Sequence, residues 1–388
     1  MVRVLIPGVD VFLSEGIWRE YLGKRIAIMS NTSGATSNLT YSVEELLSRG
    51  LNVEGVLAPE HGFWGIYHAG EPVPHMYDQY LGLNIYSLYR SSMDLALELL
   101  EQCDVVIVDI QDLGLRFYTY ISTLIDLLDI ASKMGGKEVV ILDRPNPLGG
   151  DIIEGPVARP ELYSYVARYS IPLRHGATIG EIALLYNYEK NLGIYVRVIK
   201  NRGWRRNLDI IDLNIPWIPP SPAIPSSWSV YTYGVTEYLE GTNISEGRGT
   251  YNPFTLFGAP FIEPRRLCER LNREKSLEGL FLRPVYFKPM FSKYQGQVCG
   301  GAYIHIIDRR RVRILNVGLK ILSTIHELYG ESLELMRVGE RYYIDQLIGD
   351  PRGRMVITGD LDLDDFSQAI EDGIRDYRER ISHVMLYR

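Results

Sequence analysis

Four continuous apolar segments in the first 150 residues constrain the fold of this chain most strongly. Their apolar residues follow one another without alternation, which is typical of strands buried on both faces of a sheet. The four segments are residues 24–31, 52–62, 104–112 and 137–147. Amphipathic stretches separate them, with apolar residues at helical spacing; they are residues 42–50, 92–102 and 120–135. This alternation predicts an α/β doubly wound domain around a mostly parallel sheet.

Polar motifs follow all four predicted strands. They read "SNTSG", "APEHG", "DIQDLGLR" and "DRPNPLGG" in chain order. Because ligands of open parallel sheets bind beyond the carboxyl ends of the strands, we expect a binding site where these motifs meet. No G-x-G-x-x-G follows the first strand and no G-x-x-x-x-G-K-[ST] occurs. A nucleotide site is therefore disfavoured, and no cofactor is predicted.

The pattern changes in the second half of the chain. The proline-dense stretch 217–227 cannot be regular helix or central strand. Beyond Gly258 we predict strands and helices of a smaller α+β domain; the strands are 281–287, 302–308 and 354–359, and the helical stretches are 311–330 and 364–387. We divide the chain into an N-terminal domain of residues 1–230 and a C-terminal domain of residues 231–388.

Composition excludes several classes of function. The net charge of -7 argues against a nucleic-acid-binding protein. No apolar run reaches the about 20 residues that a membrane span needs. The first residues do not resemble a leader peptide, so we expect a cytoplasmic protein.

The three cysteines are too few and too scattered for a disulfide framework or a metal site. The 27 tyrosines against 10 phenylalanines suit sugar binding, although a tyrosine-rich surface would give the same count.

The motif "PEHG" supplies Glu60 and His61 at the end of the second strand. A glutamate in a partly apolar cleft can have a raised pKa and act as a general acid. The alternative is a solvated glutamate in a turn. His61, His68 and His75 recur every seven residues, but glycines and prolines between them exclude a helix. No metal site is predicted.

Further candidates follow the third and fourth strands. Arg116 can bind a carboxylate with two parallel hydrogen bonds, and Tyr118 and Tyr120 open a helix from which one can face the cleft. Packing of both tyrosines is an equal alternative. Arg144 and Asn146 lie in "DRPNPLGG". In "RHGATIGE", His175 precedes a helix that Thr178 and Glu181 are expected to cap.

The stretch "EGTNISEGRGT" contributes Glu240, Asn243, Glu246 and Arg248. Together with Glu60, its two glutamates suggest the carboxylate pair that cleaves glycosidic bonds. Lys293 in "FSKYQG" can pair with an anionic group of a substrate, or lie in a surface turn.

These motifs resemble the exo-β-N-acetylmuramidases of the NamZ type, also described as DUF1343. The resemblance runs along nearly the whole chain; it includes "GKRIAIMSNTSG", "PEHGFWG", "RFYTYISTL", "DRPNPLGG", "RHGATIGE", "WIPPSP", "EGTNISEGRGT", "PFTLFGAPF" and "FSKYQGQVCGG". It implies a metal-free hydrolase that removes a terminal β-linked N-acetylmuramic acid, or a related amino sugar, from muropeptide-type substrates. It also implies a Rossmann-like N-terminal domain and a cleft against the smaller domain.

Roles follow from the same motifs. Glu60 is expected to be the catalytic acid, with Glu246, Tyr118 and Tyr120 at the reaction centre. The residues expected to bind the substrate are His61, Glu71, Arg116, Arg144, Asn146, His175, Glu240, Asn243, Arg248 and Lys293. Because N-acetylmuramic acid carries a lactyl carboxylate, at least one arginine should face it. The chain departs from the family pattern in the expected cleft at Trp64 and Ala223, where arginine and asparagine are common. A non-catalytic protein that binds sugars or muropeptides on the same fold is the alternative.

Overall fold

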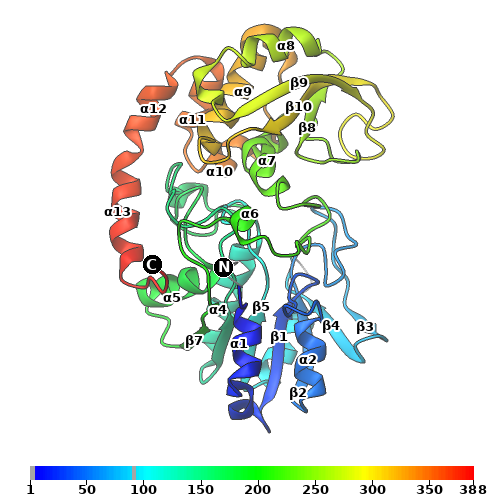
Figure 1. The fold of residues 1–388 in the computed structure, drawn as a ribbon, viewed down its shortest axis with the longest axis vertical. Coiled ribbons are helices and arrows are strands. Elements are labelled where there is room, and N and C mark those ends of the chain that lie inside the picture. The colour runs from blue at the N-terminus through cyan, green and yellow to red at the C-terminus, as the bar shows by residue number, and fades with distance from the viewer. Residues whose placement is uncertain (1–4, 90–92) are drawn as a thin grey trace.

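The computed structural model describes residues 5–89 and 93–388 (Figure 1). Its larger sheet has the strand order β3-β4-β2-β1-β5-β6-β7. The strands are β1 (Arg25–Ser30), β2 (Asn52–Ala58), β3 (Met76–Asp78), β4 (Leu83–Ser87), β5 (Val105–Asp109), β6 (Glu138–Leu142) and β7 (Tyr195–Ile199). All neighbours pair in parallel except β3 with β4. The predicted mostly parallel sheet is confirmed.

Helices lie on both faces of this sheet and beyond it. They are α1 (Gly8–Ser14), α2 (Ser42–Ser48), α3 (Asp94–Gln102), α4 (Tyr120–Met134), α5 (Ile179–Lys190), α6 (Ile210–Leu213), α7 (Ser229–Thr236), α8 (Pro264–Leu271), α9 (Ile314–Tyr329), α10 (Tyr343–Ile348), α11 (Arg352–Thr358), α12 (Leu363–Ala369) and α13 (Glu371–Ser382). The three helices predicted in the first half correspond to α2, α3 and α4, although Ser92, where the second was expected to begin, lies outside the described residues.

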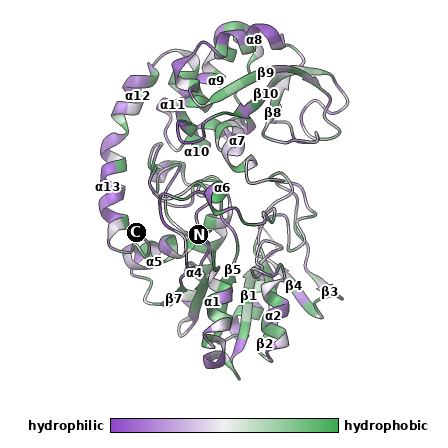
Figure 2. Cartoon of the chain, viewed as in Figure 1, coloured by the Kyte–Doolittle hydropathy of each residue, from purple (hydrophilic) through white to green (hydrophobic). Residues whose placement is uncertain are grey.

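The central strands are apolar on both faces because each face has its own core. Ala27 and Met29 of β1 belong to the core that includes the buried side chains of α3 and α4. Ile26 and Ile28 point the other way, into the core formed with α1 and α2. Figure 2 shows the same strands in the hydrophobic colour between helices of mixed hydropathy. The unbroken apolar runs of the sequence thus arise from burial on both faces.

The strand order reverses between β1 and β5. From β1 the chain continues to β2 and β4 on one side, and later to β5, β6 and β7 on the other. A crevice forms beyond the carboxyl ends of the strands at such a point. The loops after β1, β2 and β5 therefore meet at one edge of the sheet.

The C-terminal half contains a three-stranded antiparallel sheet in the order β8-β10-β9. Its strands are β8 (Leu256–Ala259), β9 (Leu280–Phe287) and β10 (Cys299–Ile306), and a two-stranded ribbon consists of β11 (Arg337–Val338) and β12 (Arg341–Tyr342). Helices α7 to α11 lie around this sheet (Figure 1). The predicted strands 281–287 and 302–308 and the predicted helix 311–330 are confirmed as β9, β10 and α9.

The strand predicted over residues 354–359 is wrong, because this segment belongs to helix α11. Gly353, Val356 and Ile357 are buried while Met355 is exposed. This spacing of three and four is helical, but a short apolar run does not reveal its period from sequence alone.

The last helices return to the N-terminal half. Helices α12 and α13 run along one side of the molecule, and the chain ends beside α5 (Figure 1). The Tyr377 hydroxyl donates to the His175 carbonyl at 2.9 Å. The Tyr387 hydroxyl donates to Asp143 at 2.6 Å and accepts a hydrogen bond from the Asn201 side chain. The C-terminal segment therefore completes the packing around β6 and β7.

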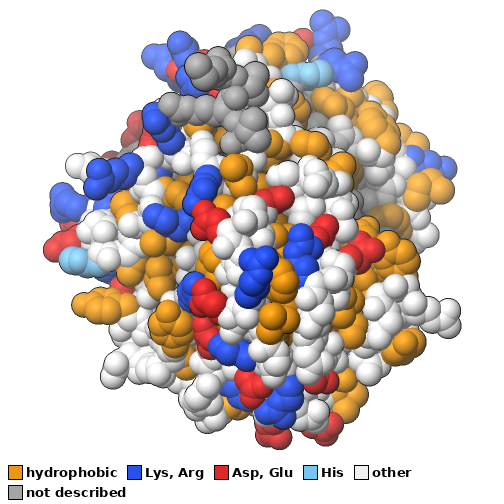
Figure 3. All heavy atoms as spheres, turned by 60° about the horizontal axis from the view of Figure 1, so that its bottom comes forward, with side chains coloured by type: hydrophobic (Ala, Val, Ile, Leu, Met, Phe, Trp, Pro, Cys, Tyr) orange, Lys and Arg blue, Asp and Glu red, His pale blue; other side chains and the backbone are white. Residues whose placement is uncertain are grey.

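The surface carries interspersed charges. On the face in Figure 3, Lys and Arg side chains alternate with Asp and Glu side chains, without a broad region of one sign. Arg25 and Asp104 at 2.9 Å and Lys24 and Glu138 at 3.0 Å are pairs of this kind. None of the helices in the described part of the chain is long and apolar enough to cross a membrane.

Tyr387→Phe should destabilise the protein more at pH 8 than at pH 5. Burial raises the pKa of Asp143 from 3.8 to about 7, so the stability linked to its proton is complete below about pH 4 and is lost as the pH rises through about 7. The hydrogen bond from the Tyr387 hydroxyl stabilises the Asp143 side chain most when it is ionised. Without it we expect a loss of about 1–3 kcal/mol at pH 8. Urea unfolding at both pH values measures this, with exposed Tyr188→Phe as the control. An equal loss at both pH values would contradict the prediction.

Candidate active site

A cavity of about 780 Å³ lies between the strand-end loops and the C-terminal half. The loops after β2 and β5 form one wall, with Glu60 and Tyr118. Part of the proline-rich stretch, with Ser221, forms another. The opposite wall comes from residues 233–254 and 291–293 and from α10. Segments far apart in the sequence thus enclose one space.

Glu60 lies at the turn directly after β2 and is only 6% exposed. Its Oε1 accepts a hydrogen bond from the Gly70 amide at 2.9 Å, and its Oε2 accepts one from the Thr119 hydroxyl at 2.8 Å. A loop and the start of α4 thus fix both oxygens of the carboxylate. Since Glu60 lines the cavity, its position and orientation suit chemistry there.

His61 follows in the left-handed region, with φ 72°. Non-glycine residues adopt this conformation rarely, and it is often found at functional sites. The His61 Nδ1 lies 2.8 Å from the Tyr67 carbonyl oxygen. Burial lowers the pKa of His61, which favours the neutral ring. Its Nδ1 then carries the proton, and Nε2 remains a hydrogen-bond acceptor beside the cavity.

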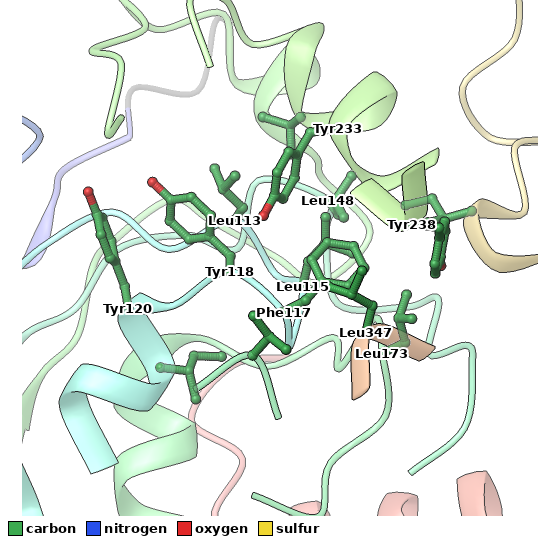
Figure 4. Packing of buried hydrophobic residues seen from close by; sticks show 14 of the residues in the cluster. Leu113, Leu115, Phe117, Tyr118, Tyr120, Leu148, Leu173, Tyr233, Tyr238 and Leu347 are labelled. Atoms are coloured by element: carbon green, nitrogen blue, oxygen red, sulfur yellow. The ribbon is translucent and has the colours of Figure 1, made fainter. Parts of the chain in front are cut away.

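Aromatic rings line the buried part of the cavity. Tyr118, Tyr233, Phe117 and Phe254 all lie on its wall. The Tyr233 ring meets Phe254 at 4.7 Å and Phe117 at 5.4 Å, both edge to face. Figure 4 shows Tyr118 and Tyr233 with Leu113 between them, among the leucines of the core. Burial raises the pKa of Tyr118 well above its usual value, so its hydroxyl stays protonated.

Tyr120 does not line the cavity. Its ring packs against Tyr118 at 4.6 Å, and the two hydroxyls lie on the same side (Figure 4). The Tyr120 hydroxyl donates to the Pro220 carbonyl and accepts a hydrogen bond from Asn31 at 2.7 Å. Tyr120 therefore joins the proline-rich stretch to the sheet, next to the residues of the cavity.

The stretch 240–250 provides a charged wall. Arg248 donates to the Glu240 carboxylate at 2.6 Å, and its Nε lies 3.4 Å from Glu246. Lys293 donates to Glu246 at 3.1 Å. These four predicted residues come together on one side of the cavity. Glu246 is 2% exposed, so the two cations offset the cost of burying its charge.

Arg116 is placed away from the cavity, although a substrate-binding role was expected. Its guanidinium is fully buried and donates to the carbonyl oxygens of Pro156, Ile171, Leu347 and Ile348 at 2.7 to 3.2 Å. Loss of hydration on burial lowers its pKa to about 10, so it remains charged. This contact set makes Arg116 a connection between the two halves of the chain.

Arg144 and Asn146 also have structural partners instead of lining the cavity. Arg144 forms a two-point ion pair with Asp109 at 2.7 and 3.0 Å at the end of β5. The Asn146 side chain donates to the Ala177 carbonyl at 2.9 Å and holds the loop after β6. Both residues shape the loops of the sheet edge.

His175 and Asn243 are likewise outside the cavity wall. His175 is buried, and its Nε2 lies 3.5 Å from Asp112. The Asn243 side chain donates to the Ser332 carbonyl at 2.9 Å and accepts from the Glu334 amide at 3.0 Å. The predicted cap of α5 is confirmed, since Thr178 accepts from the Glu181 amide in a capping box.

Exposed residues surround the opening of the cavity. The His68 ring lies 4.3 Å from the Phe291 ring, which connects the loop after β2 with the loop after β9. Glu71 accepts a hydrogen bond from the His68 amide at 2.9 Å. These contacts place Glu71 at the rim.

The two departures from the family pattern lie in different places. Trp64 was expected in the cleft, but it donates to Asp78 at 2.5 Å, packs between Tyr41 and Tyr80, and does not line the cavity. Ala223 does line it. In residues 5–89 and 93–388, no group of three His, Cys, Asp or Glu side chains is arranged to hold a metal ion.

Several cavity residues had no sequence signal that we recognised; they are Thr119, Tyr165, Tyr233, Glu237, Tyr343 and Gln346. Glu237 could have been found, since it lies three residues before Glu240 and therefore on the same face of a helical turn. Thr119 lies between the candidates Tyr118 and Tyr120 of "RFYTYISTL", whereas the others lie in segments that carry no polar motif.

Comparison with known proteins agrees with this architecture. The chain is 38% identical to the peptidoglycan beta-N-acetylmuramidase NamZ of Bacillus subtilis (strain 168) over 381 residues, covering 98% of this chain and 91% of that protein. It is similar to crystal structures of two DUF1343 family proteins from Bacteroides fragilis NCTC 9343. One has a TM-score of 0.87 at 30% identity and full coverage of both chains. The other has a TM-score of 0.74 at 26% identity, with 99% coverage of each.

The family assignment rests on both halves of the chain. Residues 26–228 match the N-terminal domain of Exo-beta-N-acetylmuramidase NamZ, and residues 231–387 match its C-terminal domain. Together with the full-length relative, these matches show that the chain belongs to the NamZ exo-β-N-acetylmuramidase family of glycoside hydrolases.

Proposed function

We propose that this protein is an exo-acting glycosidase that removes a terminal β-linked N-acetylmuramic acid from peptidoglycan fragments. The observation that carries the proposal is the cavity itself, which places the fixed carboxyl group of Glu60 in one space with the charged wall of Glu240, Glu246, Arg248 and Lys293. Membership of the NamZ family favours turnover over the non-catalytic alternative.

Glu60 is the proposed general acid. Its proton passes to the glycosidic oxygen as the bond from that oxygen to C1 breaks. Water then attacks C1 and gives up a proton to the Glu60 carboxylate, which restores the acid. The Thr119 hydroxyl can donate to Oε2 when Glu60 is ionised and can accept from it when Glu60 is protonated. The same contact therefore holds the carboxyl group in both states.

Glu246 and Arg248 have complementary proposed roles. Lys293 and Arg248 keep a negative charge at Glu246, which can stabilise the positive charge that develops on the sugar ring. Among the described residues, Arg248 and Lys293 supply the Lys and Arg side chains that line the cavity. Since each Lys293 N–H already has an acceptor, we assign the lactyl carboxylate to Arg248.

Glu60→Gln should lower kcat on a chromogenic β-N-acetylmuramide by on the order of 10²–10⁴-fold, because the amide cannot donate the proton. Steady-state kinetics measures this, with exposed Glu98→Gln on α3 as the control. Activity retained in Glu60→Gln would remove the assigned acid. Failure of the wild type to hydrolyse any amino-sugar glycoside would remove the proposed function.

Lys293→Met should destabilise the protein by about 1–3 kcal/mol, because the buried Glu246 carboxylate loses one of its two cationic partners and keeps Arg248. Adding Glu246→Gln should recover more than half of this loss, since no uncompensated charge then remains. Urea unfolding of both variants, with exposed Lys288→Met as the control, tests the coupling. Additive losses in the double variant would contradict it.

A further inference from the structure

Glu237 is a buried glutamate on the cavity wall that the proposed reaction does not use. It opens the short helix Glu237–Gly241 after α7 and is 3% exposed. Its carboxyl group is in side-chain hydrogen-bond contact with that of Glu240. Its Oε2 is buried and has no hydrogen-bond partner. A buried polar atom without a partner is costly, and at a cavity it indicates a place where a ligand supplies the missing bond.

The cations near Glu237 are already bound by other carboxylates. Lys293 donates to Glu246 and to the carbonyls of Leu239 and Ile244, at 2.8 to 3.1 Å. Arg248 donates to Glu240 through two nitrogens and lies beside Glu246. Burial, with the negative charges of Glu240 and Glu246, raises the pKa of Glu237 well above its usual value despite the opposing charge of Arg248.

Burial and the neighbouring carboxylates therefore favour the protonated form of Glu237. A proton in the hydrogen bond between Glu237 and Glu240 removes the repulsion between two adjacent carboxylates. Oε2 of Glu237 then acts as a carbonyl-type acceptor. The group that complements it is a neutral donor, such as a sugar hydroxyl.

The wall of the cavity has an exposed rim, which we take as its open end, and a buried part. His68, Glu71, Phe291 and Ser292 at the opening are exposed. Glu237 is buried, and so are the neighbouring wall residues; they include Phe117, Tyr233 and Phe254. Glu237 thus belongs to the buried part of the wall, which we take as the closed end of the cavity.

The orientation of a terminal sugar follows from this shape. The leaving group on C1 is the rest of the glycan fragment, so C1 must face the open end. C4 lies across the pyranose ring from C1 and consequently faces the closed end. Resting on the proposed function, we propose that the carboxyl group of Glu237, braced by Glu240, binds the free C4 hydroxyl of the terminal sugar.

This contact accounts for attack at the chain end. A glycan continuing from C4 would have to occupy the space of Glu237 and the aromatic wall. It would also replace the hydroxyl that donates to Oε2, leaving this buried acceptor unsatisfied. The lactyl group on the adjacent C3 falls beside Arg248, which contacts Glu240.

The test combines two variants with two substrates, a chromogenic β-N-acetylmuramide and its 4-deoxy analogue. Glu237→Gln should keep kcat/KM within about threefold, because an amide donates to Glu240 and still presents an acceptor oxygen. Glu237→Met should lower kcat/KM on the parent substrate roughly 10–100-fold. The kcat/KM of the wild type should be lower by a similar factor on the 4-deoxy analogue than on the parent substrate. For Glu237→Met, kcat/KM should be nearly the same on the two substrates. Exposed Glu98→Met is the matched control.

Three outcomes would overturn the proposal. If Glu237→Met lowered kcat/KM relative to the wild type by the same factor on both substrates, Glu237 would have a structural role only. A loss of about a thousandfold in Glu237→Gln, with an altered pH profile, would show that Glu237 transfers a proton. Equal affinity of wild type and Glu237→Met for free N-acetylmuramic acid, measured by calorimetry, would show that no hydroxyl is bound there. A wild type inactive on both substrates would instead reject the proposed function.

Discussion

One buried guanidinium holds the two halves of this protein in register. Arg116 donates to the carbonyls of Pro156 and Ile171 on one side and to those of Leu347 and Ile348, at the end of α10, on the other. A cation at a helix C-terminus is favoured by the helix dipole. Tyr118 and Thr119 follow within three residues, and Tyr343 and Gln346 of α10 lie on the same cavity. Arg116 thus connects two walls of the active site.

The sequence predicted the sheet well because burial on both faces leaves an unmistakable pattern. Unbroken apolar runs such as that of β5 occur where no face is solvated, and their polar ends mark one edge. Helix α11 was not predicted because a run of seven residues does not establish a period. Local pattern therefore predicts elements best where they are long or buried on both sides.

Prediction of the site was less complete for a different reason. Motifs identify loops, but not which way each side chain points. Glu60, Glu246, Arg248 and Lys293 reach the cavity, whereas Arg144 pairs with Asp109 in the same crevice region. A loop near a reaction centre needs groups that fix its backbone as well as groups that face the substrate, and polar residue types serve both purposes. Only coordinates separate the two.

The return of the C-terminal helix has a consequence for the order of folding. The hydroxyl of Tyr387 is the donor for Asp143, which lies 244 residues earlier in the chain. A growing chain on the ribosome exposes the larger sheet long before this tyrosine exists. During that interval the N-terminal half keeps a carboxyl group without its final partner and the α5 surface uncovered. Completion of the first half must therefore wait until Tyr387 has been synthesised, so the two halves mature together rather than in succession.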